Sequence, residues 1–224
     1  MIELKDVWVK YPDGVYGLRG IDLKFEGGFL AVLGPNGSGK TTMLKVMACI
    51  LKPTRGSVFI RGVDPWALPE DRLLRLRRRH IYVQEKPKML KGDVLYNVAY
   101  PLRLRGVSRD ESRRRALEAL EELRISRLAE FDAKRLSAGQ ARLVSIARAI
   151  AVNPEVMLFD EPTAYLDRDN RRLVLGLLKR LKDRGVGLVV ASHVGEVAEI
   201  ADEAITLEQG KITGRSRRKG GSEN

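Results

Sequence analysis

The fold of this chain is decided by the stretch Gly34-Pro35-Asn36-Gly37-Ser38-Gly39-Lys40-Thr41. It matches the pattern G-x-x-x-x-G-K-[ST], in which glycines allow backbone N–H groups to converge on a phosphate. An apolar run at residues 29–33 precedes the loop, and a helix-like segment at residues 42–47 follows it. A glycine-rich turn with an unrelated lysine would share the pattern but would not require both flanks. The order of strand, loop and helix therefore predicts a nucleotide-phosphate site.

Two side chains of this loop carry the chemistry that a nucleoside triphosphate needs. Lys40 would place a positive charge against the β- and γ-phosphates, and the hydroxyl of Thr41 would bind Mg²⁺. Thr42 follows at the start of the helix, whose N-terminus favours an anion. We therefore expect the loop and Thr42 to bind the nucleotide.

The composition is that of a globular protein. Of 224 residues, 44% are hydrophobic and 31% are charged, which allows one α/β core with a small subdomain. No apolar run approaches the roughly 20 residues that a membrane span needs. The chain starts as a charged, alternating strand rather than a signal peptide, so we expect a cytoplasmic protein.

The chain is strongly basic, with 41 Lys and Arg against 29 Asp and Glu and a net charge of +12. Such a surface suits nucleic acid, an anionic membrane or acidic ligands, and a solvated surface without a specific partner is equally compatible. The single cysteine, Cys49, excludes an internal disulfide and is expected to be a small core residue. His80 follows a run of arginines and is expected at the surface.

The spacing of apolar residues predicts an antiparallel opening before a parallel α/β core. Residues 2–9 and 18–25 alternate as half-buried strands do, whereas residues 156–159 and 186–191 are continuous apolar runs typical of strands buried on both faces. Residues 93–124 are helical, with a capping-box signature at residues 108–111. Further helices are expected at residues 39–51, 64–80, 138–152, 168–184 and 194–201, and a terminal hairpin at residues 204–213.

These elements indicate one domain at residues 1–213. Its core would comprise residues 1–85 and 153–213, and a helical subdomain at about residues 86–152 would be inserted between them. The remaining residues 214–224 are polar and basic and are expected to be disordered.

Two carboxylates, Asp160 and Glu161, end the apolar run at residues 156–159. In a P-loop fold that strand lies near the phosphate loop, so Asp160 can hold Mg²⁺ through its oxygens. Glu161 would then orient or deprotonate a water that attacks the γ-phosphate. An acid at the end of a strand is a weak signal alone, but together with the phosphate loop it becomes specific.

A second motif, Leu136-Ser137-Ala138-Gly139-Gln140, heads the helix expected at residues 138–152. Ser137 is a good N-cap, which explains that residue by itself. At this position in the chain, however, the stretch resembles the signature motif of the ABC ATPase family, which ordinary P-loop kinases and GTPases lack. Ala138 stands where the family usually has glycine, and Ala141 replaces a more usual polar or basic residue.

The resemblance covers most of the chain, because six motifs fall in the family's order. They are the phosphate loop, Gln84 after a strand, residues 136–140, Asp160-Glu161-Pro162, residues 164–167 and His193 after the last core strand. The family's fold implies an α/β P-loop NTPase core with an antiparallel β subdomain and an inserted helical subdomain, which the apolar pattern also indicates.

The resemblance implies further roles, residue by residue. Tyr11 resembles the aromatic that stacks on adenine, and a simple turn tyrosine is the alternative. Gln84 resembles the glutamine that reaches Mg²⁺ and the attacking water and links the site to a membrane partner. His193 resembles the histidine that hydrogen-bonds the γ-phosphate, and Asp167 the acid that contacts the opposing protomer.

In this family ATP is held between two subunits, which places Ser137, Gly139 and Gln140 of one subunit against the phosphate loop of the other. The resemblance implies an ATP-hydrolysing subunit that uses ATP and Mg²⁺, as a homodimer or with a paralogue. It would act at the inner face of the membrane beneath separate permease subunits, with a solute-binding protein as a further candidate partner. Residues 95–104 resemble the region that receives a membrane subunit, although their apolar side chains equally suit an internal core.

The segment after Gln84 resembles import systems more than export systems, so the resemblance favours import. The alternative function is a soluble ABC-type ATPase that acts on nucleic acid or ribosomes, in keeping with the net charge of +12. Such relatives generally fuse two ATPase units or insert long coiled coils, and this chain has neither. We therefore expect no specific nucleic acid partner.

Overall fold

The computed structural model describes residues 1–193 and 195–218. They form two compact units. The first comprises Met1–Tyr82, Glu155–Glu161 and the described part of Lys182–Asn224, and the second comprises Val83–Pro154 and Pro162–Leu181. The second unit thus holds the segment expected to be a helical subdomain and, in addition, most of the helix that follows residue 167. Within the described residues, no helix combines the length and the apolar character that crossing a membrane requires.

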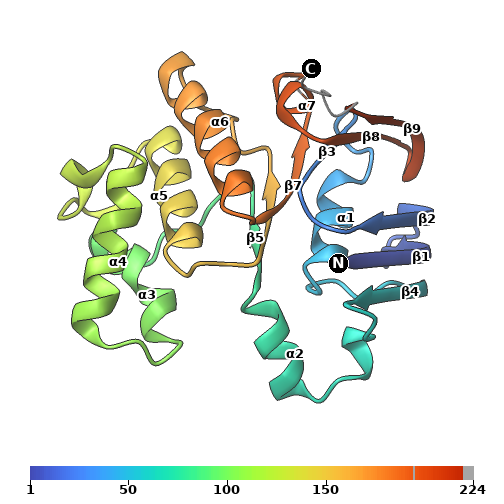
Figure 1. Ribbon diagram of the computed structural model, residues 1–224, viewed down its shortest axis with the longest axis horizontal. Helices are drawn as coiled ribbons and strands as arrows, with labels where there is room; N and C mark the ends of the chain where they lie inside the picture. The colour runs from blue at the N-terminus through green and yellow to red at the C-terminus, as the bar shows by residue number, and fades with distance from the viewer. Residues whose placement is uncertain (194, 219–224) are drawn as a thin grey trace, which may run out of the picture. The chain divides into compact units, whose positions relative to one another are not determined.

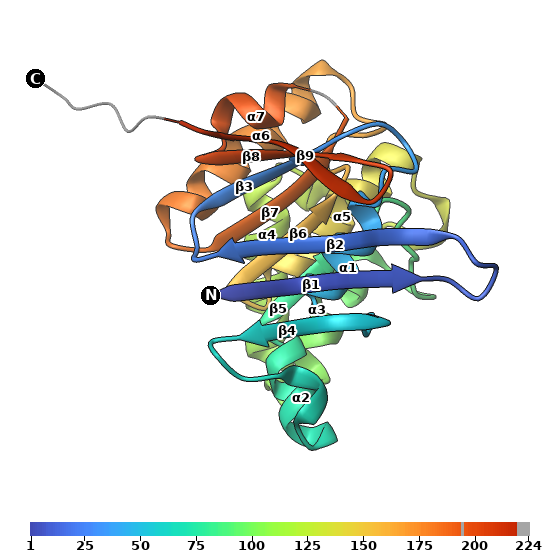
Figure 2. The same ribbon diagram turned by 90° about the vertical axis from the view of Figure 1, so that its right-hand side faces the viewer.

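The first unit carries a three-stranded antiparallel sheet in the order β2-β1-β4 (Figures 1 and 2). Its strands are β1 (Ile2–Lys10), β2 (Tyr16–Phe25) and β4 (Arg55–Ile60). β1 buries Ile2 and Leu4 and then Val7 and Val9, because a register shift between Leu4 and Val7 moves the inward face on by one residue. The strand predicted at residues 2–9 is therefore confirmed, and the spacing of three in its pattern marks this bulge.

A second sheet has six strands in the order β5-β6-β7-β3-β8-β9. Its strands are β3 (Phe29–Leu33), β5 (His80–Val83), β6 (Val156–Asp160), β7 (Gly187–Ser192), β8 (Glu203–Glu208) and β9 (Lys211–Arg217). Parallel pairing joins β3 to β7 and β8, and β6 to β7. Every residue of β6 and β7 is buried, as predicted for strands covered on both faces. The parallel strands bring the end of β3, where the phosphate loop begins, to the same sheet edge as Asp160.

Helix α1 (Lys40–Met47) starts within the phosphate loop and is shorter than the helix expected at residues 39–51. Cys49 has a φ of 57°, in the left-handed region that ends helices, before Pro53 is reached. Burial raises the pKa of the Cys49 thiol to about 12, which agrees with a core residue. The other described helical segments of this unit are η1 (Pro65–Ala67), α2 (Glu70–Arg77) and α7 (Glu196–Ile200).

The second unit is helical. It contains α3 (Val94–Arg103), α4 (Arg109–Glu122), η2 (Ser126–Leu128), η3 (Ala133–Arg135), α5 (Ala138–Ile150) and most of α6 (Arg168–Asp183). Ser108 caps α4 by accepting a hydrogen bond from the backbone N–H of Glu111 at 3.3 Å, as the capping signature predicted. Pro101 lies inside α3 and has no N–H for the carbonyl of Asn97. Nε of Arg148 on α5 donates to that carbonyl at 3.2 Å, which offsets the lost helix bond and ties α3 to α5.

Part of the segment expected to be disordered is a strand. β9 continues to Arg217 and pairs with β8, and Glu203 on β8 forms ion pairs with both Arg215 and Arg217. Paired backbone and these ion pairs account for the order, whereas the composition of residues 214–217 pointed only to their polarity. Lys219 and the rest of the basic tail lie outside the described residues.

Candidate functional site

The phosphate loop relies on glycines whose conformations other residues rarely adopt. Gly34, Gly37 and Gly39 have φ values of 145°, 78° and 106°. A Cβ on Gly34 would lie 2.2 Å from the carbonyl oxygen of Leu207, and one on Gly39 would lie 2.3 Å from that of Gly17. Substitution at either position would displace backbone as well as strain the loop. The glycines predicted from the pattern are therefore required by both conformation and space.

Lys40 is only 6% exposed, and its ammonium group lies against the loop. Nζ donates hydrogen bonds to the carbonyls of Gly34 and Pro35 at 2.7 and 3.1 Å and lies 3.7 Å from Oε1 of Glu161. The hydroxyl of Ser38 is buried and, among the described residues, has no hydrogen-bond partner. A cation and an unused hydroxyl in a loop of converging N–H groups fit a phosphate group.

Thr41 and Asp160 come together where β3 and β6 end. The hydroxyl of Thr41 donates to Oδ2 of Asp160 at 2.7 Å, and the hydroxyl of Tyr82 donates to the same oxygen at 2.9 Å. Asp160 is 3% exposed. Oxygen atoms of a hydroxyl and a carboxylate are the ligands that Mg²⁺ prefers, so this pair fits a magnesium ion.

Glu161, directly after β6, has the features of a positioned base. Its φ is 49°, an uncommon conformation for a residue with a side chain, and its N–H donates to the carbonyl of Ala191 on β7 at 3.0 Å. Oε2 lies 2.9 Å from Nδ1 of His193, while Oε1 lies 3.7 Å from Lys40. Only 7% of the residue is exposed. The carboxylate is therefore held from two sides, by Lys40 of the phosphate loop and by His193, whose role the resemblance implied.

Tyr11 lies close to the start of α1. Its hydroxyl is 2.8 Å from that of Thr42, and a Cβ on Gly17 would lie 2.8 Å from its ring. Tyr11 therefore contacts Thr42, the residue that directly follows the phosphate loop. An adenine-stacking role for Tyr11 stays a prediction.

The signature residues lie in the second unit, where Ser137 caps α5. Its Oγ accepts from the N–H of Gln140 at 3.2 Å, and Oε1 of Gln140 accepts from the N–H of Ser137 at 3.0 Å, which completes a capping box. A Cβ on Gly139 would lie 3.0 Å from the carbonyl oxygen of Tyr165. The N-cap predicted for Ser137 is confirmed, and Gln140 is now explained as its partner.

Gln84 and Asp167 are also in the second unit. The Gln84 backbone carbonyl accepts from Nη1 of Arg142 at 2.6 Å, and its side chain is exposed. Asp167 accepts from the backbone and side-chain N–H groups of Asn170, both at 2.8 Å, and the backbone bond lowers the pKa of Asp167. Asp167 thereby caps the first turn of α6 and remains exposed.

The sequence did not indicate two of these contacts. Tyr82 lies on β5, which ends at Val83, one residue before Gln84, and the alternation of side chains along that strand was the signal for the face on which Tyr82 lies. Arg142 is 1% exposed on a helix predicted from its apolar residues alone. The expectation for His80 was wrong, since it is 6% exposed at the start of β5 and burial lowers its pKa to about 4.

The fold and the phosphate loop, with Asp160 and Glu161 at one edge of a largely parallel sheet, define a P-loop NTPase. Within that class, the family described as ABC transporter matches residues 18–164. The chain therefore belongs to the ABC transporter family and is an ATPase of that family.

The chain is 37% identical to the uncharacterized ABC transporter ATP-binding protein MJ0796 of Methanocaldococcus jannaschii, over 98% of each chain. A dimeric structure of MJ0796 in a post-hydrolysis state with ADP and Pi has a TM-score of 0.92 and 35% identity, over 98% of this chain and 100% of that one. The structure of cbiO1 from Clostridium perfringens, part of the ABC transporter complex cbiONQ, has a TM-score of 0.84 at 26% identity, over 96% and 88% of the two chains. The macrolide export ATP-binding/permease protein MacB of Shigella flexneri is 35% identical over 95% of this chain and 34% of its own length.

Proposed function

We propose that this chain is the ATP-hydrolysing subunit of a transporter. It pairs with a second copy or a paralogue and drives a solute through separate membrane permease subunits. The observation that carries the proposal is the carboxylate of Glu161, which is buried beside the loop lysine and held 2.9 Å from His193. A base fixed next to a phosphate-binding loop is what hydrolysis of a terminal phosphate requires.

The named residues divide the chemistry among them. The loop N–H groups and Lys40 bind the phosphates. Thr41 and Asp160 would hold Mg²⁺, which would supply positive charge that offsets the phosphate oxygens, and a role for Gln84 as a further ligand stays a prediction. Glu161 accepts a proton from the water whose oxygen bonds to the γ-phosphorus, while the bond from that phosphorus to ADP breaks. His193 orients the carboxylate through its contact with Oε2 and binds the γ-phosphate.

A second molecule completes the site with Ser137 and Gly139. A hydroxyl has one hydrogen to donate and two lone pairs. Because Ser137 accepts from the Gln140 N–H through one lone pair, its hydrogen remains available for a phosphate oxygen. The residue can therefore cap its own helix and serve the nucleotide on the partner at the same time, and Asp167 lies beside the partner's site.

Helix α3 supports docking to a permease subunit. It buries Val98 and Leu102 while leaving Tyr96 36% exposed, and Leu104 directly after it is 59% exposed. Residues 95–104 thus contribute buried side chains to the core, and we propose that their exposed side chains contact the permease subunit. We place the protein on the cytoplasmic face of the membrane, with import as the favoured direction and a solute-binding protein as a candidate partner. Because one of the similar proteins is named for macrolide export, sequence similarity alone does not decide between import and export.

Two serine caps in the second unit provide a matched test. Ser108 and Ser137 each accept a hydrogen bond from an N–H three residues on, at 3.3 and 3.2 Å. Replacing either by alanine should cost a similar stability, about 1 kcal/mol. Only Ser137→Ala should lower the rate of ATP hydrolysis, by about tenfold or more, because only it loses a donor to the phosphate.

Thermal unfolding and steady-state ATP hydrolysis of both variants measure the two effects separately. Equal hydrolysis rates in Ser108→Ala and Ser137→Ala would reduce Ser137 to a helix cap and contradict the shared site.

A further inference from the structure

A surface cavity of about 390 Å³ lies in the first unit, away from the phosphate loop. Its position is set by the amino ends of two strands, since His80 begins β5 and Glu155 immediately precedes β6, and by helix α2. In both views α2 lies beyond β4, the edge strand of the three-stranded sheet (Figures 1 and 2). The carboxyl ends of the same strands carry the ATP site, so this cavity serves a different purpose.

Four arginines line the cavity, and a single acid opposes them: Arg61, Arg72, Arg75 and Arg79 against Glu155. Glu155 is shared, because Arg61 and Arg79 bond to its two carboxylate oxygens at 2.9 and 3.1 Å. Arg75 pairs with Asp71 one helical turn away. Within residues 1–193 and 195–218, Arg72 has no ion pair. Even after these pairs are counted, the cavity keeps an excess of positive charge.

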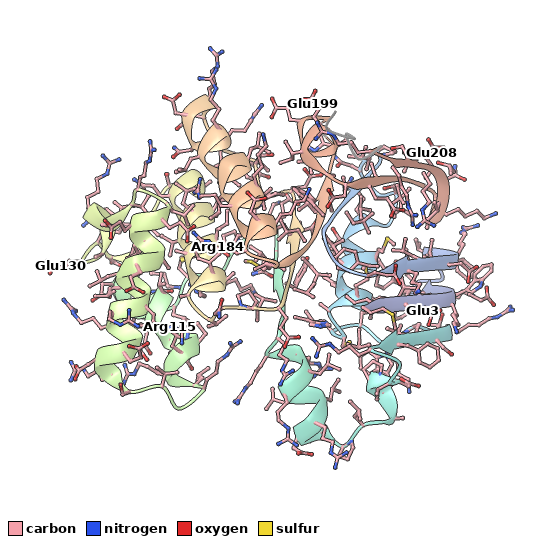
Figure 3. All side chains as sticks on the ribbon, viewed as in Figure 1. Glu3, Arg115, Glu130, Arg184, Glu199 and Glu208 are labelled. Atoms are coloured by element: carbon pink, nitrogen blue, oxygen red, sulfur yellow. The ribbon has the colours of Figure 1, made fainter. Side chains whose placement is uncertain are left out.

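Further acids lie close by in the chain, with Glu70 and Asp71 on α2 and Asp64 next to Val63, and of these Asp71 pairs with Arg75. Glu199 on α7 and Glu208 at the end of β8 lie at the opposite end of this unit from α2, as Figure 3 shows. The guanidinium group of Arg72, which has no ion pair among the described residues, can therefore bind an anion from outside, and its planar donors suit phosphate oxygens in particular.

The walls of the cavity are apolar: Ile60, Val63, Leu68 and Leu76. Val63 is 47% exposed, and α2 has no fully buried residue. A helix that buries so little of itself leaves apolar surface uncovered beneath its arginines. A purely ionic ligand such as inorganic phosphate would leave those walls in water.

His80 also lines the cavity. Its Nδ1 is buried and has no hydrogen-bond partner among the described residues. Because burial lowers its pKa to about 4, the ring is neutral at pH 7 and adds no charge to the arginines around it.

We propose that this cavity binds an amphipathic phosphate monoester, either a free metabolite or the headgroup of a lipid. Its phosphate contacts Arg72 and the neighbouring arginines at the rim, and its apolar body lies against Val63, Leu68 and Leu76. The two features select for a molecule that carries negative charge and apolar surface together.

The test uses the full chain and n-octyl phosphate as the probe, with inorganic phosphate and 1-octanol as partial ligands, by calorimetry. Octyl phosphate should bind saturably and at least about tenfold more tightly than either partial ligand. Arg72→Ala should weaken it by about tenfold, the loss expected of one charged hydrogen bond. Val63→Trp, which keeps every charge but fills the mouth, should abolish it.

The matched control is Arg78→Ala, which removes an exposed arginine next to α2 that does not line the cavity and should change the affinity less than about twofold. Circular dichroism and the melting temperature establish that each variant is folded. Vesicles of phosphatidic acid in phosphatidylcholine identify the source, since competition with octyl phosphate indicates a lipid and its absence a soluble ester. Octanol binding as tightly as octyl phosphate, or equal affinities in Arg72→Ala and Arg78→Ala, would overturn the proposal.

Discussion

The two ends of strand β6 show how one sheet supports two different electrostatic environments. At the carboxyl end, Lys40, Asp160 and Glu161 are between 3% and 7% exposed and are held by contacts to one another and to neighbours. At the amino end, the side chain of Glu155 is 39% exposed between two arginines that are more exposed still. Charge is buried and fixed at one end and solvated at the other.

Helix α1 explains much of this difference, because it presents opposite ends to the two environments. Its N-terminus lies in the phosphate loop, where the helix dipole favours an anion. Beyond its C-terminus, Nε of Arg77 donates to the carbonyl of Cys49 at 2.8 Å. Anion binding at the carboxyl end thus draws on backbone N–H groups together with Lys40, whereas at the amino end it would depend on side chains alone.

The largest expected effect on ATP turnover comes from Glu161→Gln, which removes the proposed base at the carboxyl end of β6. Loss of the base should lower ATP turnover by about 10²–10⁴-fold while nucleotide binding persists, because the loop and Lys40 are intact. The variant should also accumulate as an ATP-bound dimer, which gel filtration with ATP detects. Glu208→Gln is the control, since Glu208 is an exposed acid at the end of β8, which pairs in parallel with β3 in the same sheet. Turnover in Glu161→Gln that matched this control would exclude Glu161 as the base.

At the amino end of the sheet, the buried His80 should make the protein less stable in acid. Its folded-state pKa of about 4 lies below the ordinary 6.5, so the unfolded chain takes up a proton first as the pH falls. The contribution is fully present above pH 6.5 and is lost as the pH falls towards 4, by up to about 3 kcal/mol. His80→Gln, which does not titrate, should reduce the fall in unfolding free energy between pH 7 and pH 4 by that amount. Denaturant titrations at the two pH values measure it, and an unchanged difference would mean that His80 is not buried as a neutral ring.

A smaller effect is expected from Tyr82→Phe. The change removes the hydrogen bond of 2.9 Å to Asp160 and keeps the ring, so it tests whether Tyr82 positions the carboxylate that is proposed to hold Mg²⁺. Apparent Mg²⁺ affinity in ATP hydrolysis should fall by about tenfold, the lower end for outer-shell partners. Tyr16→Phe, at an exposed tyrosine on β2, should leave it unaltered. Equal magnesium titration curves for the two variants would show that Tyr82 does not position Asp160 for Mg²⁺ binding.

The sequence predicted the buried end of the sheet better than the exposed end, for a physical reason. The phosphate loop, Asp160 and Glu161 each occupy positions that local chemistry requires, namely a glycine turn and the end of an apolar strand. The environment of His80 depends instead on the packing of α2, a short helix that buries no residue fully. Arg142 and residues 214–217 were likewise set by partners distant in the chain, the Gln84 carbonyl and strand β8, which periodicity does not reveal.

The central claim is that each ATP site combines the phosphate loop of one molecule with Ser137 of another, and mixing two inactive variants tests it most directly. Lys40→Ala impairs the phosphate loop, and Ser137→Ala impairs the signature motif. In a dimer with one chain of each variant, the intact loop of the Ser137→Ala chain meets the intact signature of the Lys40→Ala chain, so one of the two sites is complete. An equimolar mixture should regain ATP hydrolysis, up to about a quarter of the wild-type rate if chains assort randomly and sites act independently. A mixture no more active than the average of the two variants alone would contradict the shared site.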